Sequence, residues 1–316
     1  MRNWKNLPIG PVFLALCLLI GCVGAPLTRD ELRQLRRYES PPLEAKSRSI
    51  SIRGKDIFYW EQGDGTPVVL LHGWPTHSYV WRHVIPRLSR NYRVFAPDLV
   101  GYGESKLSPG EGRTVGDQAS YVAEMIDELG IGRAIVVGQG TGGAIAQLLA
   151  VNYPEHVRGL CLINSACFDS WPSEYAKLLA EPGWGGFTSP LTGHRAGFKG
   201  YMKQGVFHQV LLAEGVVNNY FRPWDGPEGR RDLVFSAKAL DNRDTQRIEG
   251  ELSRIRIPTL VIASTFDPFQ HLNYSKRLAS SIPRAEFVQI KDCGHFATED
   301  EPEKIVKNIL AYFGKN

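Results

Sequence analysis

Two polar residues with the chemistry of an acid–base pair follow β-rich runs near the end of the chain. His295 lies in the segment Asp292–Phe296, after one such run, and Asp267 follows the run before it. A histidine accepts a proton from water near neutral pH, and a carboxylate on its second ring nitrogen orients the ring and stabilises its charged form. The two residues therefore predict acid–base chemistry, provided that the fold brings their loops together.

A glycine-rich segment, Gly138-Gln139-Gly140-Thr141-Gly142-Gly143, lies between a β-rich run and a helical stretch. Taken alone it fits G-x-G-x-x-G, the pattern with which nucleotide-binding proteins bring a pyrophosphate to a helix N-terminus. That pattern also expects an acidic residue about 20 positions further on. The next strand ends in Asn164 instead, and a nucleotide would explain none of the other motifs. Dinucleotide binding is therefore only an alternative.

The elements that must position these residues alternate between strands and helices from Ser49 onward. Several strands are continuous apolar runs, such as Ala-Ile-Val-Val, as a parallel sheet covered on both faces requires. Helical stretches, for example 117–129 and 145–153, separate them, and this alternation is typical of an α/β doubly wound domain. The strands are expected at 49–53, 56–61, 67–72, 92–97, 134–138, 160–164, 259–263 and 286–290.

The alternation is interrupted between Cys167 and Ile248. This segment is rich in Gly, Trp and Tyr and mostly helical in pattern, and the strands resume after it. Open α/β sheets bind ligands at the carboxyl ends of their strands. We therefore expect the segment to be an insert that covers this edge of the sheet.

The composition is that of an ordinary globular protein. The 316 residues are 43% hydrophobic and 22% charged, with a formal net charge of +4, which excludes an intrinsically disordered chain. Lys and Arg form no run interleaved with aromatic residues, so no nucleic-acid partner is predicted. The His and Cys residues show no ligand spacing of the C-x-x-C or H-E-x-x-H kind, so neither a metal nor a cofactor is predicted.

The N-terminus has the pattern of an export signal. Two cationic residues precede the apolar stretch 12–20, which is shorter than the about 20 apolar residues of a transmembrane helix. Leu19-Ile20-Gly21-Cys22 resembles the lipobox of bacterial lipoproteins, in which the cysteine is lipidated and becomes the new N-terminus. The resemblance implies a signal peptide at 1–21, a lipid on Cys22 that anchors the protein to a membrane of the bacterial cell envelope, and a spacer at 22–48. A plain signal peptide is the alternative.

Taken in chain order, the motifs make the sequence similar to the α/β-hydrolase superfamily across residues 49–313. The matching motifs are His72-Gly73-Trp74-Pro75, the segment 97–105, the glycine-rich segment, Phe266-Asp267-Pro268 and Asp292–Phe296. The segment HGWPTHSYVWR and the insert resemble most closely the branch that contains epoxide hydrolases and haloalkane dehalogenases.

This resemblance implies the α/β-hydrolase fold, with a mostly parallel eight-stranded sheet and helices on both of its faces. The core would comprise residues 49–166 and 249–316. A helical cap at 167–248 would be inserted after the sixth strand.

The nucleophile elbow of this fold, however, has no nucleophile here. Family members carry it at the centre of G-x-Nu-x-G, on a strained strand-to-helix turn, and the flanking glycines make Gly140 the centre. Epoxide hydrolase and dehalogenase relatives would carry Asp there, and esterase relatives Ser. Thr141 has a hydroxyl but lies off the apex, so we do not expect it to substitute. Dehalogenase relatives carry Trp at position 141 to hold the halide, so its absence argues against haloalkane dehalogenation.

The remaining catalytic parts that the resemblance implies are present. His295 would be the general base, and Asp267 would orient its ring. Asp169, after the sixth strand, is the alternative acid, because some family members place it there. The backbone N–H groups of Trp74 and Thr141 would form the oxyanion hole, the second of them at a helix N-terminus.

Other polar and aromatic residues are expected to have structural roles. We expect His72 and Asp98 to brace their loops, Cys293 to be a buried neighbour of the histidine rather than a nucleophile, and Arg195 and Arg222 to face solvent. Epoxide-opening relatives use cap Tyr hydroxyls as acids, but most cap aromatics are expected in the core of the cap. These aromatics are Trp171, Tyr175, Trp184, Tyr201, Tyr220 and Trp224.

Two hypotheses for the function follow. The first is a hydrolase that acts on a small apolar epoxide, ester or lactone without a covalent intermediate: the space at Gly140 would hold a water that the His295–Asp267 pair activates. Oxyanion stabilisation and positioning alone leave about 10³–10⁴-fold catalysis over water, so losing the nucleophile need not abolish activity. The second is a catalytically inactive protein that binds a small apolar ligand or a protein partner. The retained acid–base pair favours the first, because a binding protein has no need of it.

Overall fold

The computed structural model describes residues 44–107, 112–181 and 195–314. The predicted signal peptide, Cys22 and the predicted spacer up to residue 43 lie outside these residues. Within the described ranges, no helix is both long enough and apolar enough to cross a membrane.

An eight-stranded sheet lies at the centre of the described chain, in the order β1-β2-β4-β3-β5-β6-β7-β8. β1, β2 and β4 are antiparallel neighbours, and the strands from β4 to β8 are parallel. The predicted mostly parallel sheet is thus confirmed. The strands are β1 (Lys46–Ile52), β2 (Lys55–Gln62), β3 (Pro67–Leu71), β4 (Arg93–Pro97), β5 (Ala134–Gln139), β6 (Val157–Ile163), β7 (Thr259–Ser264) and β8 (Ala285–Ile290).

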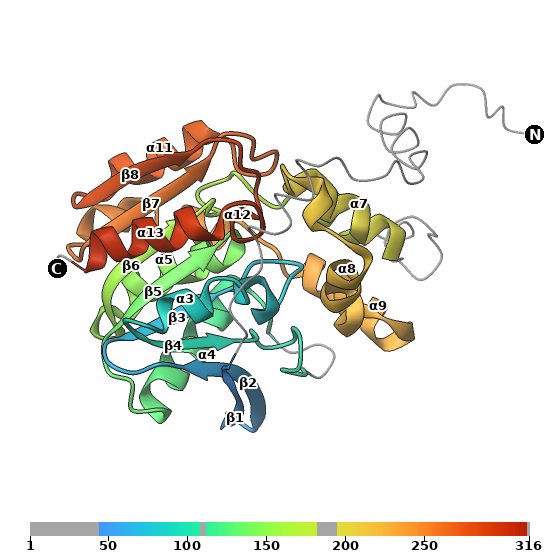
Figure 1. Ribbon diagram of the computed structural model, residues 1–316, viewed down its shortest axis with the longest axis horizontal. Coiled ribbons are helices and arrows are strands. Elements are labelled where there is room, and N and C mark those ends of the chain that lie inside the picture. The colour runs from blue at the N-terminus through green and yellow to red at the C-terminus, as the bar shows by residue number, and fades with distance from the viewer. Residues whose placement is uncertain (1–43, 108–111, 182–194, 315–316) are drawn as a thin grey trace, which may run out of the picture. The chain divides into compact units, whose positions relative to one another are not determined.

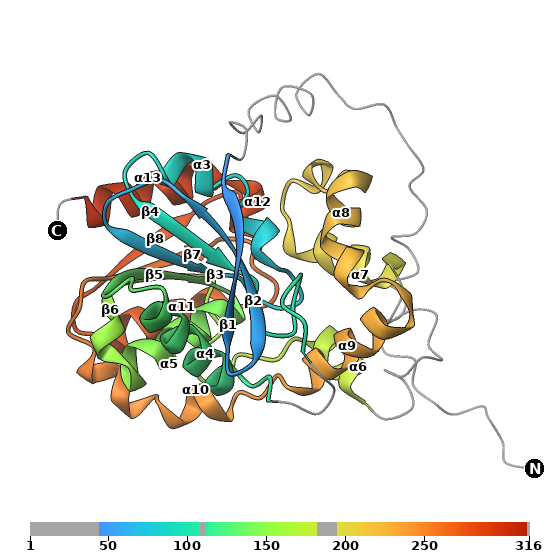
Figure 2. The ribbon, with the colours of Figure 1, turned by 90° about the horizontal axis from the view of Figure 1, so that it is seen from below.

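Helices cover both faces of the sheet, with α3 and α13 on one face and α4, α5 and α11 on the other (Figure 2). All side chains of β5 and β7 are consequently buried, which is why these strands are continuous apolar runs. The helices of the core are α3 (Ile85–Leu88), α4 (Val115–Glu128), α5 (Thr141–Asn152), α11 (Leu272–Ser281), α12 (Ala297–Asp300) and α13 (Pro302–Phe313), with the 3₁₀ turns η2 (Ser78–Trp81) and η3 (Pro154–His156).

Between β6 and β7 the chain leaves the sheet and forms the cap. Its helices α7, α8 and α9 lie beyond the carboxyl ends of the parallel strands (Figure 1), so the predicted insertion after the sixth strand is confirmed. The cap helices are α6 (Glu174–Ala180), α7 (Arg195–Gly205), α8 (Glu214–Phe221), α9 (Gly226–Lys238) and α10 (Arg243–Arg247), with η4 (Gln209–Leu211), η5 (Arg222–Trp224) and, after them, η6 (Gly250–Arg254).

The first strand begins earlier than its sequence predicts. β1 starts at Lys46 rather than Ser49, so residues 46–48 belong to the sheet and not to the predicted spacer. Lys46 pairs with Glu61 of β2, and Arg48 makes an ion pair with the same carboxylate at 2.5 Å. Because β1 is an exposed edge strand, its first residues are polar and have no apolar signature.

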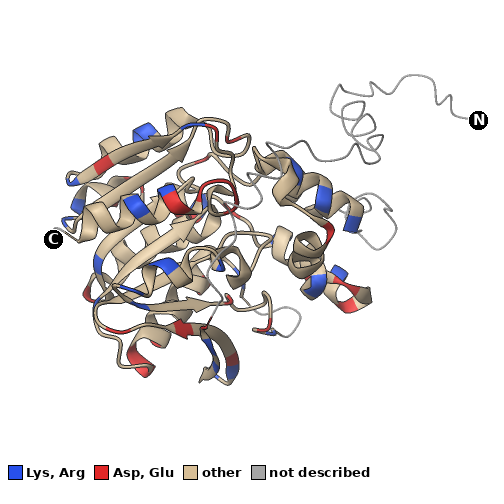
Figure 3. Cartoon of the chain, viewed as in Figure 1, with Lys and Arg blue, Asp and Glu red and all other residues tan. Residues whose placement is uncertain are grey.

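Charged side chains of both signs are spread over the helices and the edge strands, and the central strands carry few of them (Figure 3). This distribution is expected when helices bury both faces of the central strands, since a charge placed there would lose its hydration.

Candidate active site

The elbow backbone is complete although the elbow side chain is absent. Gly140 connects β5 to α5 with φ 58° and ψ −124°, in the left-handed region that favours glycine. Its N–H donates to the Ile163 carbonyl at 3.1 Å, and its carbonyl accepts from the Ala166 N–H at 2.9 Å. Backbone hydrogen bonds to the end of β6 and to the segment after it therefore hold the sharp turn without any side chain at residue 140.

The neighbouring glycines allow close packing of the elbow. A Cβ atom on Gly142 would lie 2.2 Å from the Leu71 carbonyl oxygen, and one on Gly138 would lie 2.3 Å from the Gly142 carbonyl oxygen. These positions require glycine because α5 starts directly against the end of β3 and against its own turn. The glycines are thus explained by protein packing rather than by the approach of a pyrophosphate, and the dinucleotide alternative loses its basis.

The predicted acid–base pair is formed by the loops after β7 and β8, which are adjacent parallel strands. His295 Nδ1 lies 2.8 Å from Asp267 Oδ2, and both side chains are buried. The other carboxylate oxygen accepts from the backbone N–H groups of Phe269 and Gln270. Asp169, the alternative acid, is exposed and interacts with Tyr274 instead. Asp267 is therefore the partner of His295.

The second ring nitrogen of His295 faces the elbow. A Cβ atom built on Gly140 would lie 3.0 Å from His295 Nε2, and the nearest atom outside the imidazole would be Gly73 Cα at 3.9 Å. Among the described residues, Nε2 of His295 has no hydrogen-bond partner. The base therefore lies directly against the position where family members carry the side chain of their nucleophile, with less room than a Cβ atom normally has.

Two buried amides that the sequence gave no reason to single out hold the histidine loop. Gln139 Nε2 and Asn164 Nδ2 both donate to the His295 carbonyl, at 3.0 and 2.9 Å, and Gln139 Oε1 accepts from the Thr298 hydroxyl at 2.9 Å. Asn164 also accepts from the Ser264 N–H at 2.8 Å, which ties the end of β6 to the end of β7. The only sign of these two residues in the sequence is that each is a polar residue at the end of an apolar run.

The predicted oxyanion hole differs from the observed arrangement. The Trp74 N–H donates to the Thr141 hydroxyl at 2.8 Å, so this predicted donor is already engaged. Thr141 follows the elbow centre by one position, and its hydroxyl lies beside Trp74 in the loop after β3. The backbone N–H of Thr141, the first residue of α5, has no acceptor within the helix and remains as a donor at this position.

A small cavity adjoins Gly140 and His295. The volume within which the centre of a water molecule fits is about 20 Å³, which is room for about one water. Aromatic side chains close it, since the ring of Tyr201 stacks on Phe269 with centroids 4.6 Å apart and meets Trp74 at 5.4 Å. The cavity is lined by Trp74, Gly140, Thr141, Ala166, Trp171, Pro172, Ser173, Tyr201, Leu240, Phe269, Gln270 and His295.

The cap aromatics divide between this cavity and the core of the cap. Trp171 and Tyr201 line the cavity, and Tyr175 stacks on Tyr201 with ring centroids 4.9 Å apart. Tyr220 and Trp224 hydrogen-bond to residues of the core domain. Burial raises the pKa of Tyr201, although the hydroxyl of Ser173 opposes this effect. The Tyr201 phenol is therefore protonated near neutral pH and is able to donate. Of the six predicted residues, Trp184 lies outside the described chain.

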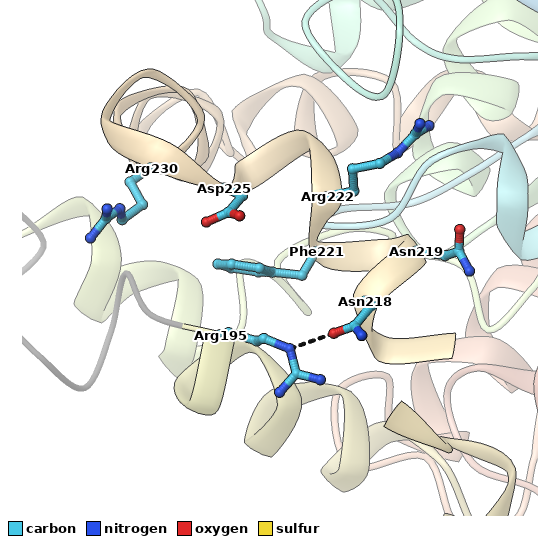
Figure 4. Close-up of a pocket in the computed structure, with 7 residues that line it drawn as sticks. All are labelled: Arg195, Asn218, Asn219, Phe221, Arg222, Asp225 and Arg230. Atoms are coloured by element: carbon cyan, nitrogen blue, oxygen red, sulfur yellow. Dashed lines mark hydrogen bonds between the residues drawn. The ribbon is translucent and has the colours of Figure 1, made fainter. Parts of the chain in front are cut away.

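A second, larger cavity of about 510 Å³ lies in the cap (Figure 4). The Phe221 ring lies between Arg195 and Asp225 there, and Arg195 Nε donates to the Asn218 side chain at 2.6 Å. Arg222, another lining residue, makes an exposed ion pair with Glu104 at 2.7 Å. The two arginines thus lie on solvated faces, as expected. Its described lining residues include one carboxylate, Asp225, and no histidine, serine, threonine or cysteine, whereas His295 lines the smaller cavity.

The loops beside the elbow are braced as predicted. His72 Nε2 accepts from the Leu99 N–H at 2.9 Å, and Asp98 accepts from the Ser78 and Glu104 N–H groups, both at 2.8 Å. Burial lowers the pKa of His72 to about 4, so its ring is neutral near pH 7. Burial also raises the pKa of the Cys293 thiol, which is therefore protonated and is a poor nucleophile.

Comparisons with known proteins agree with this geometry. The family described as alpha/beta hydrolase fold matches residues 66–302. Haloalkane dehalogenase 2 of Mycobacterium tuberculosis is 28% identical over 279 residues, which cover 84% of this chain and 93% of that protein. A soluble epoxide hydrolase of a Corynebacterium species is 26% identical over 277 residues, which cover 83% of this chain and 95% of that protein.

A solved structure with the same architecture is an alpha/beta hydrolase fold protein from Burkholderia ambifaria. It matches with a TM-score of 0.79 and 27% identity, over 87% of this chain and 99% of that one. The family match spans most of the sequence and includes the elbow, the acid loop and the histidine loop. The chain belongs to the alpha/beta hydrolase fold family.

Proposed function

We propose that this protein is a membrane-anchored hydrolase that activates water directly with the His295–Asp267 pair and forms no covalent intermediate. The observation that carries the proposal is the position of His295 at the cavity beside Gly140: among the described residues its Nε2 has no hydrogen-bond partner, and it faces the side of Gly140 on which a nucleophile would stand. The adjoining cavity has room for about one water. A buried, oriented base next to a water-sized space is the arrangement that general-base hydrolysis requires.

In the proposed reaction the water oxygen attacks an electrophilic carbon of the substrate. His295 Nε2 takes one proton of the water, and the charge that develops on the imidazolium is stabilised by Asp267. The bond between the carbon and its leaving oxygen breaks, and the electron pair passes to that oxygen. The Thr141 N–H stabilises the developing negative charge. The proton on His295 neutralises the leaving group, either directly or through the Tyr201 phenol, which gives its own proton to the leaving group and receives that of His295.

The substrate class follows from the lining of the cavity. Trp171, Tyr201 and Phe269 make its walls apolar, which favours a small apolar epoxide, ester or lactone. Because the cavity itself has room for about one water, binding of such a substrate requires these side chains to move apart. The similarity to a soluble epoxide hydrolase supports this class. Thr141 takes the place of the tryptophan that would hold a halide, which argues against haloalkanes although a dehalogenase is among the relatives.

One observation favours a second candidate, a catalytically inactive protein that binds a small apolar ligand or a protein partner. The Trp74 N–H, which would stabilise an oxyanion, is satisfied by the Thr141 hydroxyl at 2.8 Å. A binding protein has no need of an unpaired donor at this position. The retained pair of His295 and Asp267 outweighs this observation, because only catalysis makes use of it.

Turnover measurements separate the two candidates. The full chain, purified in detergent, is assayed on a panel of esters, epoxides, lactones and haloalkanes as wild type, His295→Ala and Gly140→Asp. Activity of the wild type that disappears in His295→Ala supports direct activation of water. A wild type that is silent while Gly140→Asp turns over an epoxide or a haloalkane means that the protein is a binder built on a disabled hydrolase.

The membrane anchor is a separate proposal, based on the sequence Leu19-Ile20-Gly21-Cys22. We propose that Cys22 carries lipid and holds the protein to a membrane of the bacterial cell envelope, since two or more acyl chains give stable attachment. Mass spectrometry of the N-terminal peptide tests the modification, and Cys22→Ser tests the attachment. An unmodified cysteine in a protein that leaves the membrane fraction would contradict it.

A further inference from the structure

Asp300 is a fully buried carboxylate to which the acid–base mechanism gives no role. It follows His295 in the same loop region, and none of its surface is exposed. Its Oδ2 accepts from the backbone N–H groups of Gly294 and Phe207, at 2.8 and 2.9 Å, and its Oδ1 accepts from that of His208 at 2.8 Å. Gly294 directly precedes the base, whereas Phe207 and His208 belong to the cap. One carboxylate therefore binds the histidine loop and the cap together.

The backbones of these two segments are in direct contact beside the carboxylate. The Phe296 N–H donates at 2.9 Å to the carbonyl of Gly205, the last residue of α7. A Cβ atom on Gly294 would lie 2.5 Å from that carbonyl oxygen, and one on Gly205 would lie 2.5 Å from the Phe296 ring. Glycine at both positions therefore allows the end of α7 to approach the histidine loop at backbone distance.

This contact sets the position of Tyr201, which lies one turn before the end of α7. The buried residues of the helix share one face, because they are three or four positions apart: Phe198, Tyr201, Met202 and Gly205. On this face the Tyr201 ring stacks on Phe269 with centroids 4.6 Å apart and lines the cavity that His295 also lines. A displacement of the end of α7 would therefore move Tyr201 relative to the base.

The base itself is held by other residues. Asp267 binds the ring of His295, and the side-chain amides of Gln139 and Asn164 bind its carbonyl. None of these three residues belongs to α7 or depends on Asp300 for its contact. Loss of the Asp300 carboxylate should therefore displace α7 and leave the imidazole in its place.

We propose that Asp300 is a positioning residue, which fixes α7 against the histidine loop so that the Tyr201 phenol passes the proton of His295 to the leaving oxygen. This inference rests on the proposed function and commits to the indirect one of its two proton routes. The phenol gives its proton to the leaving oxygen as the bond from that oxygen to the carbon breaks, and it receives the proton of the His295 imidazolium. Asp300 touches no reacting atom and acts through Tyr201.

The test is Asp300→Asn in the full chain, assayed on substrates whose leaving groups differ. The amide keeps the shape of the side chain but turns an NH₂ group toward backbone N–H donors, which loosens the end of α7. Styrene oxide and ethyl acetate form an alkoxide that requires a proton, whereas p-nitrophenyl acetate releases a phenolate that is stable without one. We expect kcat on the first two to fall about 10- to 100-fold with little change in KM, since misplacement by about 1 Å has an effect of that size. On p-nitrophenyl acetate kcat should stay within a few-fold of wild type.

A double variant shows whether Asp300 acts through Tyr201. Tyr201→Phe removes the phenol proton, and adding Asp300→Asn to it should lower kcat no further, because the effects of coupled residues are not additive. Equal falls of kcat on the alkoxide-forming and the phenolate-forming substrates would overturn the positioning role while leaving the proposed hydrolase intact. So would a further fall in the double variant, or an unchanged kcat in Asp300→Asn.

Gly205→Ala tests the same contact if Asp300→Asn fails to fold. Its methyl group would press on the Phe296 ring and should cause the same selective loss by a smaller factor. The matched control is Gly200→Ala on the same helix, where a Cβ atom would meet nothing within 4 Å, and equal losses in the two variants would contradict the proposal. A wild type that acts on neither styrene oxide nor ethyl acetate overturns the role of Asp300, and one that is silent on the whole panel overturns the proposed function as well.

Discussion

The active site has two halves that are held together by different kinds of interaction. In the elbow half, backbone hydrogen bonds of Gly140 and close packing of Gly138 and Gly142 set the turn. In the acid–base half, side chains do this work, since Asp267, Gln139 and Asn164 fix the ring and the loop of the histidine. The elbow half therefore keeps its conformation without a nucleophile, whereas the acid–base half depends on each of its side chains.

The two halves also differ in charge. The loops beside the elbow contain the neutral ring of His72 and one buried carboxylate that braces them, Asp98, whereas the buried carboxylates of Asp267, Glu299 and Asp300 lie at the histidine loop. Asp300 accepts from the N–H groups of Phe207, His208 and Gly294. Burial raises the pKa of Asp300, although these hydrogen bonds oppose the shift.

Glu299 extends the charged half to the cap. It forms a two-point ion pair with Arg82, at 2.5 and 2.6 Å, and accepts from the hydroxyl of Tyr220 in α8. Burial alone would raise the pKa of Glu299, but Arg82 outweighs this effect and the pKa is lowered. The Tyr220 hydrogen bond joins the cap to the half of the site that contains the base, and Trp224 joins it to the loop after β3 by donating to the Pro75 carbonyl.

The largest effect is expected in the acid–base half itself. Asp267→Asn keeps an acceptor for the backbone of residues 269 and 270 but presents an amide to His295, which stabilises the wrong tautomer. We expect activity to fall by about 10⁴-fold, as in other triads, with little change in thermal stability. The matched control is Asp169→Asn, which alters the exposed alternative acid. Equal losses in the two variants would contradict the assignment of Asp267.

The next effect tests the buried ion pair of Arg82 and Glu299. Glu299→Gln leaves the buried Arg82 without its charge partner, and breaking a buried pair costs about 3–5 kcal/mol of unfolding free energy. The control is Glu303→Gln, which removes the partner of Arg87. The Glu303 side chain is 69% exposed, so this change should lower the unfolding free energy by at most about 1 kcal/mol. Urea unfolding measures both values. A similar small loss in each variant would show that the buried pair contributes no more to stability than the exposed one.

The pH dependence of stability tests the neutral character of the elbow half. His72 has a pKa of about 4 in the folded protein and about 6.5 when unfolded. The unfolded chain therefore binds an extra proton between these values, so stability is lost as the pH falls from about 6.5 to about 4, by about 3 kcal/mol in total. His72→Gln keeps an acceptor for the Leu99 N–H and should flatten the curve by this amount. Parallel curves for the two proteins would refute the prediction.

A smaller effect on stability is expected from filling the elbow. Gly140 and Gly130 have similar positive φ angles, 58° and 60°, but only a methyl group on Gly140 would meet a neighbour, His295 Nε2 at 3.0 Å. Each change to Ala should cost roughly 1–2 kcal/mol for its backbone conformation. Gly140→Ala should in addition abolish turnover, because the methyl group takes the place of the water. Gly130→Ala should be fully active, and full activity in both variants would argue against a water at the elbow.

The smallest effect is expected from Thr141→Val, which removes the acceptor of the Trp74 N–H and preserves the shape of the side chain. One hydrogen bond contributes about 0.5–1.5 kcal/mol to stability, so the melting temperature should fall slightly. Ester turnover should rise, because Trp74 becomes free to stabilise an oxyanion. A fall in turnover would indicate instead that the hydroxyl of Thr141 takes part in the reaction.

Local patterns in the sequence were sufficient to predict the architecture of the core. Apolar runs such as Ala-Ile-Val-Val predicted the buried parallel strands, and the order of the glycine, aspartate and histidine motifs predicted the family and the missing nucleophile. These signals are local because burial on both faces requires every residue of a strand to be apolar. The edge strand β1 has only one neighbour and no such requirement, so its start at Lys46 was missed.

The tertiary structure alone decided how the site is connected. Asp169 and Asp267 both follow strands, and only the position of β7 beside β8 selects Asp267 as the partner of His295. The contact between Thr141 and Trp74 joins residues 67 positions apart, and Gln270 meets Ser170 across 100 positions. Sequence patterns report the burial of a residue, whereas these contacts depend on distances between loops that only the packed sheet and cap determine.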